Sequence, residues 1–184
     1  MDNSTITWAN FFFNAGCSLI ASIFFLFVVL ILFKPKLKIC PFICKSKLEF
    51  DGDEEFCLFK IVNRSFFSAY DVKAELSLLR KYPVPPSGMM NVRYVPLEMA
   101  LSKISHIPPF RPRWWRKSAD HAIRLRTIEN LTEYLEDNHC SIELRISLRH
   151  GLTGLSRVVR YEYSHISELK IGNFTYGSKF AVLN

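Results

Sequence analysis

The first 33 residues contain no lysine and no arginine, and no charged side chain of either sign lies between Trp8 and Phe33. This lack of bases argues against a cleaved signal peptide, which needs a basic start, a shorter apolar core and a small-residue cleavage site. The uncharged run also exceeds the ~20 residues that a helix needs to cross a bilayer. We therefore predict a transmembrane helix over residues 8–33, preceded by an extracytoplasmic tail of residues 1–7.

The position of the first bases predicts the orientation of this helix. All 24 lysines and arginines follow the apolar run, together with 16 of the 17 acids, so the rest of the chain carries a net charge of +8. Basic flanks stay on the cytoplasmic side of a membrane. We predict a single-pass protein of the inner (plasma) membrane with its amino terminus outside. Residues 34–47 are expected to be a basic juxtamembrane linker and residues 48–184 a cytoplasmic domain. The lysines expected to face lipid are Lys34, Lys36, Lys38, Lys45 and Lys47.

Signatures of enzymes are missing from the chain. It contains no glycine-rich phosphate loop, no metal-binding pair of histidines and no nucleophile elbow. Cys40 and Cys44 are four residues apart, but no second pair follows at the spacing of a zinc finger. Disulfides rarely persist in the cytosol, so we expect free thiols. The sequence predicts neither an enzyme nor a bound metal or cofactor.

Alternation of apolar and polar residues dominates the chain after the linker. It is clearest at residues 142–149, where Ile142, Leu144, Ile146 and Leu148 alternate with charged or polar side chains. The turn at residues 150–154 predicts a hairpin with residues 156–163. Residues 56–62, 70–79 and 91–97 are further strand candidates, and residues 129–136 form one short helix candidate. This pattern predicts a mainly-β, immunoglobulin-like sandwich.

The apolar run itself carries a polar stripe. Asn10, Asn14, Ser18 and Ser22 recur every four residues and so share one face of the predicted helix. An asparagine in hydrocarbon is costly unless it meets another polar group or water. The stripe is either a helix-packing interface or the water-facing side of a pore, and both interpretations require an oligomer.

A cluster of bases and tryptophans lies within residues 107–126. Guanidinium groups beside aromatic rings suit phosphate binding and base stacking, but they also suit lipid headgroups. A third interpretation is a loop whose tryptophans pack under the sandwich. On the first interpretation the ligand-binding residues are Arg111, Arg113, Trp114, Trp115, Arg116, Lys117, His121 and Arg124.

Three stretches resemble the cytoplasmic domain of inward-rectifier potassium channels in the order in which they occur. They are residues 59–81, residues 119–125 and the predicted hairpin at residues 140–174. The chain has one membrane helix and no TVGYG-like filter, so the resemblance does not extend to potassium selectivity. It implies an immunoglobulin-like sandwich that assembles as a ring, by analogy a homotetramer.

The layout also resembles the Hailong-type transmembrane effectors of bacterial anti-phage defence. That resemblance implies a channel-like tetramer controlled by single-stranded DNA oligomers, which a partner nucleotidyltransferase would make. Effectors whose membrane-anchored β-barrels sense cyclic oligonucleotides are a neighbouring possibility. We therefore expect an oligomeric, channel-like effector of antiviral defence with a nucleic-acid or nucleotide ligand. The alternative is a membrane-tethered adaptor that binds a protein partner or anionic lipid and forms no pore.

Overall fold

A computed structural model of the chain describes residues 3–32, 36–47, 55–85, 88–111, 119–151 and 153–183. The chain divides into two compact units, residues 1–34 and residues 35–184. The first unit is helical and the second is mainly β.

Helix α1 (Asn3–Leu32) forms the first unit. Its segment Thr7–Val29 is long and apolar enough to cross a membrane. The described side chains along it are exposed or half-buried in a single copy of the chain, as expected for a helix whose partners are lipid or other helices. The predicted membrane-spanning helix is confirmed in length and composition.

The first sheet of the β domain is built around β3 (Glu55–Asn63). One edge of β3 pairs with the short strands β1 (Leu37–Ile39) and β2 (Ile43–Lys47), one after the other, and the other edge pairs with β7 (Ala122–Thr127). β10 (Leu169–Ile171) continues the sheet by pairing in parallel with β2.

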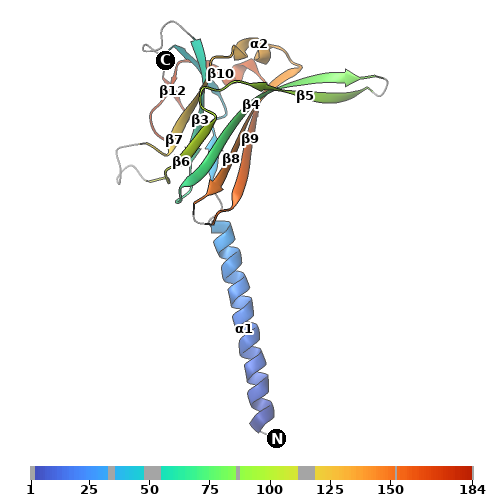
Figure 1. Cartoon of the computed structure of the whole chain (residues 1–184), viewed down its shortest axis with the longest axis vertical. Helices are drawn as coiled ribbons and strands as arrows, with labels where there is room; N and C mark the ends of the chain where they lie inside the picture. Colours follow the sequence, from blue (N-terminus) through green and yellow to red (C-terminus); the bar gives the residue numbers. More distant parts are fainter. Residues whose placement is uncertain are drawn as a thin grey trace. The chain divides into compact units, whose positions relative to one another are not determined.

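The second sheet is built around the long strand β4 (Ala69–Val84). One edge of β4 pairs with β6 (Lys103–Ile107) and then β5 (Met89–Leu97), and the other edge pairs with β8 (Cys140–His150). The predicted hairpin is present, because β9 (Ser156–Tyr163) pairs antiparallel with β8. Figure 1 shows β4 and β5 extending together beyond the other strands. The shorter elements are α2 (Leu131–Glu136), the 3-10 helix η1 (Ile166–Glu168), β11 (Asn173–Phe174) and β12 (Val182–Leu183).

One hydrophobic core lies between the two sheets. Leu144 and Ile146 of β8 are fully buried, and Phe59 and Ile61 of β3 contribute from the other sheet. The Tyr163 hydroxyl donates a 2.7 Å hydrogen bond to the Cys40 carbonyl, which joins the end of β9 to the first sheet. The predicted alternation at residues 142–149 is confirmed, and the domain is a mainly-β, sandwich-like fold.

The outer face of the first sheet is also covered. Residues 173–183 return across it, and Phe174 packs with Phe56, Leu58 and Cys44 in a second, smaller cluster. Strand β3 is consequently buried on both faces from Phe56 to Asn63. This covered outer face contains the candidate site described below.

The folded domain starts earlier in the chain than predicted. Residues 37–47 were expected to be a linker, but they form β1 and β2, whose backbone groups pair with β3. Lys45 forms a 2.9 Å ion pair with Glu55, and Lys47 lies 3.9 Å from the same carboxylate. These two lysines therefore lie on the folded domain rather than on a free linker. Lys36 and Lys38 are exposed, and Lys34 lies outside the described residues.

Candidate functional site

The structure describes three of the eight predicted ligand-binding residues. Arg111 is exposed, His121 lies just before β7, and Arg124 lies on β7 itself. The other five lie outside the described residues, so their predicted role stays a prediction. They are Arg113, Trp114, Trp115, Arg116 and Lys117.

His121 is a buried residue, and its predicted role in ligand binding stays a prediction. Its side chain is 7% exposed, and its ring packs edge-on against Phe110 at 5.3 Å between centroids. His150 is buried as well, with Nδ1 3.1 Å from the Thr153 hydroxyl. Burial lowers the pKa of both imidazoles below their ordinary value. Both rings are expected to be neutral in the folded domain at pH 7.

These two histidines predict a loss of stability in mild acid. At a pH between the lowered pKa of the folded state and the ordinary value of about 6.5, the two imidazoles are protonated in the unfolded chain but neutral in the folded chain. The free energy of unfolding should therefore be constant above about pH 6.5 and fall as the pH drops from there. Urea unfolding between pH 7.5 and about pH 5.5 measures this slope. The double variant His121→Gln/His150→Gln should flatten this slope. An unchanged slope in the double variant would assign it to other groups.

Two cations face each other across β3 and β7. Lys60 and Arg124 are direct cross-strand partners, although the Lys60 side chain is only 1% exposed. Burial lowers the pKa of the Lys60 amine, and the positive charge of Arg124 lowers it further. Like charges directly opposite each other destabilise a sheet. Among the described residues, neither cation forms an ion pair with a carboxylate.

Backbone carbonyls of the C-terminal segment (residues 173–183) accept hydrogen bonds from both cations. Lys60 Nζ donates to the carbonyl oxygens of Thr175 at 2.7 Å and Lys179 at 2.8 Å. Arg124 Nη2 donates to the Phe174 carbonyl at 2.8 Å. A third cation, Arg64, donates to the Ser178 carbonyl at 3.1 Å, and its guanidinium lies 5.7 Å from the centre of the Phe110 ring. Carbonyl dipoles hold these cations in place but carry no net charge to balance them.

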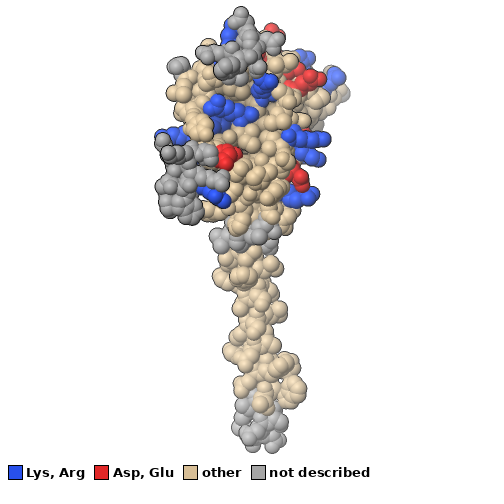
Figure 2. Space-filling model, turned by 60° about the vertical axis from the view of Figure 1, so that its left-hand side comes forward, with Lys and Arg blue, Asp and Glu red and all other residues tan. Residues whose placement is uncertain are grey.

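A cavity of about 310 Å³ opens beside the pair. Tyr176 stands at it, 71% exposed, and its hydroxyl accepts a 3.2 Å hydrogen bond from the Ala119 amide. Ala119, which lines the cavity, is the first described residue after the predicted tryptophan and arginine segment. Figure 2 shows several Lys and Arg side chains close together on one face of the β domain. The residues lining the cavity are Lys60, Ala119, Ala122, Arg124, Thr175, Tyr176 and Gly177.

The cysteines near this site are suited to packing and not to metal binding. Burial raises the pKa of the Cys40 thiol to about 11 and that of Cys44 to about 12. Thiolates, which are the form that binds metals, are therefore disfavoured at neutral pH. Across the described ranges, no group of three or more metal-ligating side chains lies together.

The serines and asparagines of the polar stripe on α1 differ in whether the helix itself can satisfy their hydrogen-bonding groups. The Ser22 hydroxyl donates a 2.8 Å hydrogen bond to the Ser18 carbonyl one turn earlier, so this hydroxyl is satisfied within the helix. Asn10 and Asn14 are exposed in a single copy, and each amide has more donors and acceptors than a helix backbone can satisfy. The demand for an outside partner therefore comes from the asparagines.

Sequence reasoning missed Lys60, Arg64 and Tyr176. A signal for Lys60 existed, because it is the only charged residue within the apolar run from Phe56 to Val62. A lysine inside a buried strand needs acceptors or an anion. Arg64 and Tyr176 gave no comparable signal, since their roles depend on the return of the C-terminal segment across the sheet.

No protein family and no curated protein matches the chain. Among solved structures, Spo0M, a sporulation control protein from Bacillus subtilis, is similar over 74% of this chain and 49% of its own, with 9% identity and a TM-score of 0.36. The chain thus spans about half the length of Spo0M. The ApaA protein from Bordetella pertussis is similar over 71% of this chain and 94% of its own, with 6% identity and a TM-score of 0.36. The resemblance to inward-rectifier potassium channels stays a prediction.

Proposed function

We propose that this protein is an oligomeric, channel-like membrane effector whose β domain binds an anionic ligand of the nucleotide or single-stranded DNA class. In this proposal the domain is an immunoglobulin-like sandwich in the cytoplasm, α1 crosses the inner membrane with its amino terminus outside, and four copies form a ring. The role is in antiviral defence, as the resemblance to Hailong-type effectors implies.

The observation that carries the ligand proposal is the pairing of Lys60 with Arg124. The two cations are adjacent across the sheet, one of them is buried, and their only described acceptors are neutral carbonyls. Folding therefore leaves a positive potential that an anion in the adjoining cavity would offset. A phosphate suits the remaining guanidinium donors of Arg124, and Tyr176 supplies an exposed aromatic ring for a base.

The same strand connects this site to the start of the domain. The Lys60 carbonyl accepts a 2.8 Å hydrogen bond from the Cys40 amide, and Leu37 of β1 pairs with Asn63. The Arg64 amide also donates to the Lys36 carbonyl. A ligand that shifts Lys60 would thus act on residues 36–40, which follow the membrane helix directly in the chain. These hydrogen bonds, and the short stretch of chain before residue 36, are the proposed route by which ligand binding shifts the equilibrium between a closed and an open assembly.

Binding of single-stranded DNA tests the proposal. The full-length protein in nanodiscs of phosphatidylcholine is titrated with a short labelled oligonucleotide at two salt concentrations. Arg124→Gln should weaken binding and reduce the log–log salt slope by about 0.7, the value for one phosphate contact on a single strand. Trp114→Ala or Trp115→Ala should weaken it about ten-fold, because a stacked base contributes ~1–3 kcal/mol.

The matched control is Arg149→Gln. Arg149 is exposed but already pairs with Asp71 at 3.3 Å, so its removal should leave affinity unchanged. Binding of vesicles that contain anionic lipid, without binding of the oligonucleotide, would support the tethered adaptor instead. Equal affinity of wild type and Arg124→Gln would remove this site from the proposal.

A further inference from the structure

A second concentration of positive charge lies where the β4–β5 hairpin leaves the sandwich. One face of this hairpin is a ladder of cross-strand pairs, and it begins with core residues, since Leu78 faces Val95. The next pair on the same face is Arg80 with Arg93. Both strands therefore change from an aliphatic residue to an arginine at the same step of the register.

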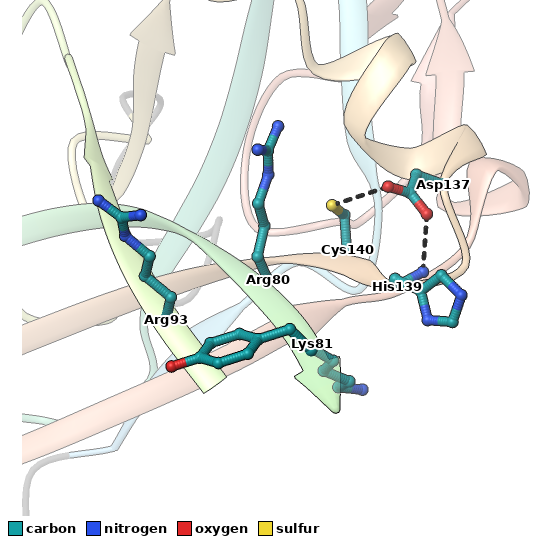
Figure 3. A pocket seen from close by; sticks show the side chains of 7 residues that line it. Arg80, Lys81, Arg93, Asp137, His139 and Cys140 are labelled. Atoms are coloured by element: carbon teal, nitrogen blue, oxygen red, sulfur yellow. Dashed lines mark hydrogen bonds between the residues drawn. The ribbon is translucent and has the colours of Figure 1, made fainter. Parts of the chain in front are cut away.

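The two arginines line a pocket of about 610 Å³. Figure 3 shows Arg80 between Arg93 and the turn that carries Asp137, His139 and Cys140. Pockets of 300–1,000 Å³ are typical of small-molecule sites. This pocket is separate from the cavity beside Lys60, because the two share no lining residue.

Neither cross-strand partner of Arg80 carries a negative charge. Its partner on one side is Arg93, and its partner on the other is Cys140, whose thiol is kept protonated by burial. Asp137 is the single carboxylate among the lining residues. The hydrogen bond from the His139 amide lowers its pKa and the charge of Arg80 helps to lower it, so Asp137 offsets part of the positive charge of the two arginines. One of its oxygens accepts from the His139 amide at 2.9 Å, and the other accepts from Cys140 Sγ at 3.2 Å.

Another arginine pair in the same sheet has a carboxylate as a cross-strand partner. Arg145 of β8 faces Arg160 of β9, but its partner on the other side is Glu75 of β4. The Arg80–Arg93 pair has a neutral cysteine in the corresponding position. A pair of arginines with no carboxylate as a cross-strand partner is well suited to a phosphate, because each guanidinium can donate parallel hydrogen bonds to the phosphate oxygens.

The next step of the ladder adds an aromatic ring. Tyr82 faces Asn91 on the same face as the arginines, and the Asn91 amide donates a 3.0 Å hydrogen bond to the Tyr82 hydroxyl. This contact holds the ring, which is 43% exposed and lines the pocket. A held aromatic ring beside two guanidinium groups matches a ligand with a flat base attached to a phosphate.

We infer that this pocket is a nucleoside phosphate site, in which Arg80 and Arg93 bind the phosphate and Tyr82 stacks on the base. The pocket is independent of the Lys60–Arg124 site, so either site can fail alone. Lys81 also lines the pocket, and its Nζ lies 3.9 Å from the Glu162 carboxylate.

Calorimetric titration of the full-length protein in detergent micelles tests this site with three probes. Adenosine monophosphate should bind, inorganic phosphate should bind about ten-fold more weakly because it lacks the stacked base, and adenosine should not bind measurably. Arg80→Gln and Arg93→Gln should each weaken adenosine monophosphate binding at least about ten-fold, the loss expected for one charge-assisted contact. Tyr82→Leu should weaken adenosine monophosphate binding and leave phosphate binding unchanged.

Two control variants make the result specific. Arg145→Gln removes an exposed arginine of the same sheet and should bind as wild type, and Arg124→Gln shows whether the probe occupies the other site. Arg80→Lys retains the charge without the fork and should bind between wild type and Arg80→Gln, which separates ligand contact from misfolding. Undiminished binding in both Arg80→Gln and Arg93→Gln, or no binding by wild type, would overturn the inference.

Discussion

Replacing Asn14 by leucine should abolish the membrane depolarisation that we expect on expression in bacterial cells. The change keeps the segment long and apolar enough to insert, but removes an amide that a single helix cannot satisfy. Whether that amide faces a neighbouring helix or pore water, its loss disrupts the arrangement that the proposed channel requires. A potential-sensitive dye reports the effect, with protein level in the membrane fraction measured in parallel.

The matched control for Asn14→Leu is Ser22→Ala. The Ser22 hydroxyl already donates to the Ser18 carbonyl within the same helix, so its removal deletes no contact between copies. Ser22→Ala should therefore depolarise as wild type. If Asn14→Leu depolarises as strongly as Ser22→Ala at equal protein levels, the stripe has no role in conduction and the adaptor alternative gains.

The β domain shows which structural features a sequence pattern can predict. The alternation at residues 142–149 predicted β8 because one face of that strand is buried and the other is not. β3 gave a weaker signal, since the C-terminal segment buries its second face as well. β1 and β2 were missed because each is at most five residues long and lies among lysines that also suit a membrane flank. Their pairing with β3 is a long-range effect.

The candidate site shows the same division between local and long-range information. Arg124 was identified from its neighbours in the chain, but Lys60 lies 64 positions earlier and meets it only through the β3–β7 pairing. The burial of His121 is likewise a long-range effect, because Phe110 and the surrounding fold bury its ring. The Arg80–Arg93 pair would follow from the sequence once the hairpin turn is placed between Val84 and Met89, because that turn fixes the register.

The return of the C-terminal segment depends on a glycine. Gly172 has a φ of +124°, a backbone conformation that residues with a side chain rarely adopt, and its amide donates to the Lys45 carbonyl at 3.0 Å. A Cβ at this position would overlap the Leu183 carbonyl oxygen and come within 2.9 Å of Val182 Cγ1. Residue 172 therefore holds β12 against β11 and cannot accept a methyl group without moving one of them.

Gly172→Ala should lower the free energy of unfolding of the β domain by about 2–5 kcal/mol, the sum of backbone strain and overpacking. Gly177→Ala separates these two causes, because φ there is +85° but nothing lies within 4 Å of the added carbon. It should cost only about 1–2 kcal/mol, the strain alone. Urea unfolding of both variants, with limited proteolysis at the C-terminal segment, measures the difference. Since Lys60 donates to two carbonyls of that segment, Gly172→Ala should also weaken oligonucleotide binding at the adjoining cavity. Equal destabilisation by the two variants would mean that β12 is not packed against Gly172.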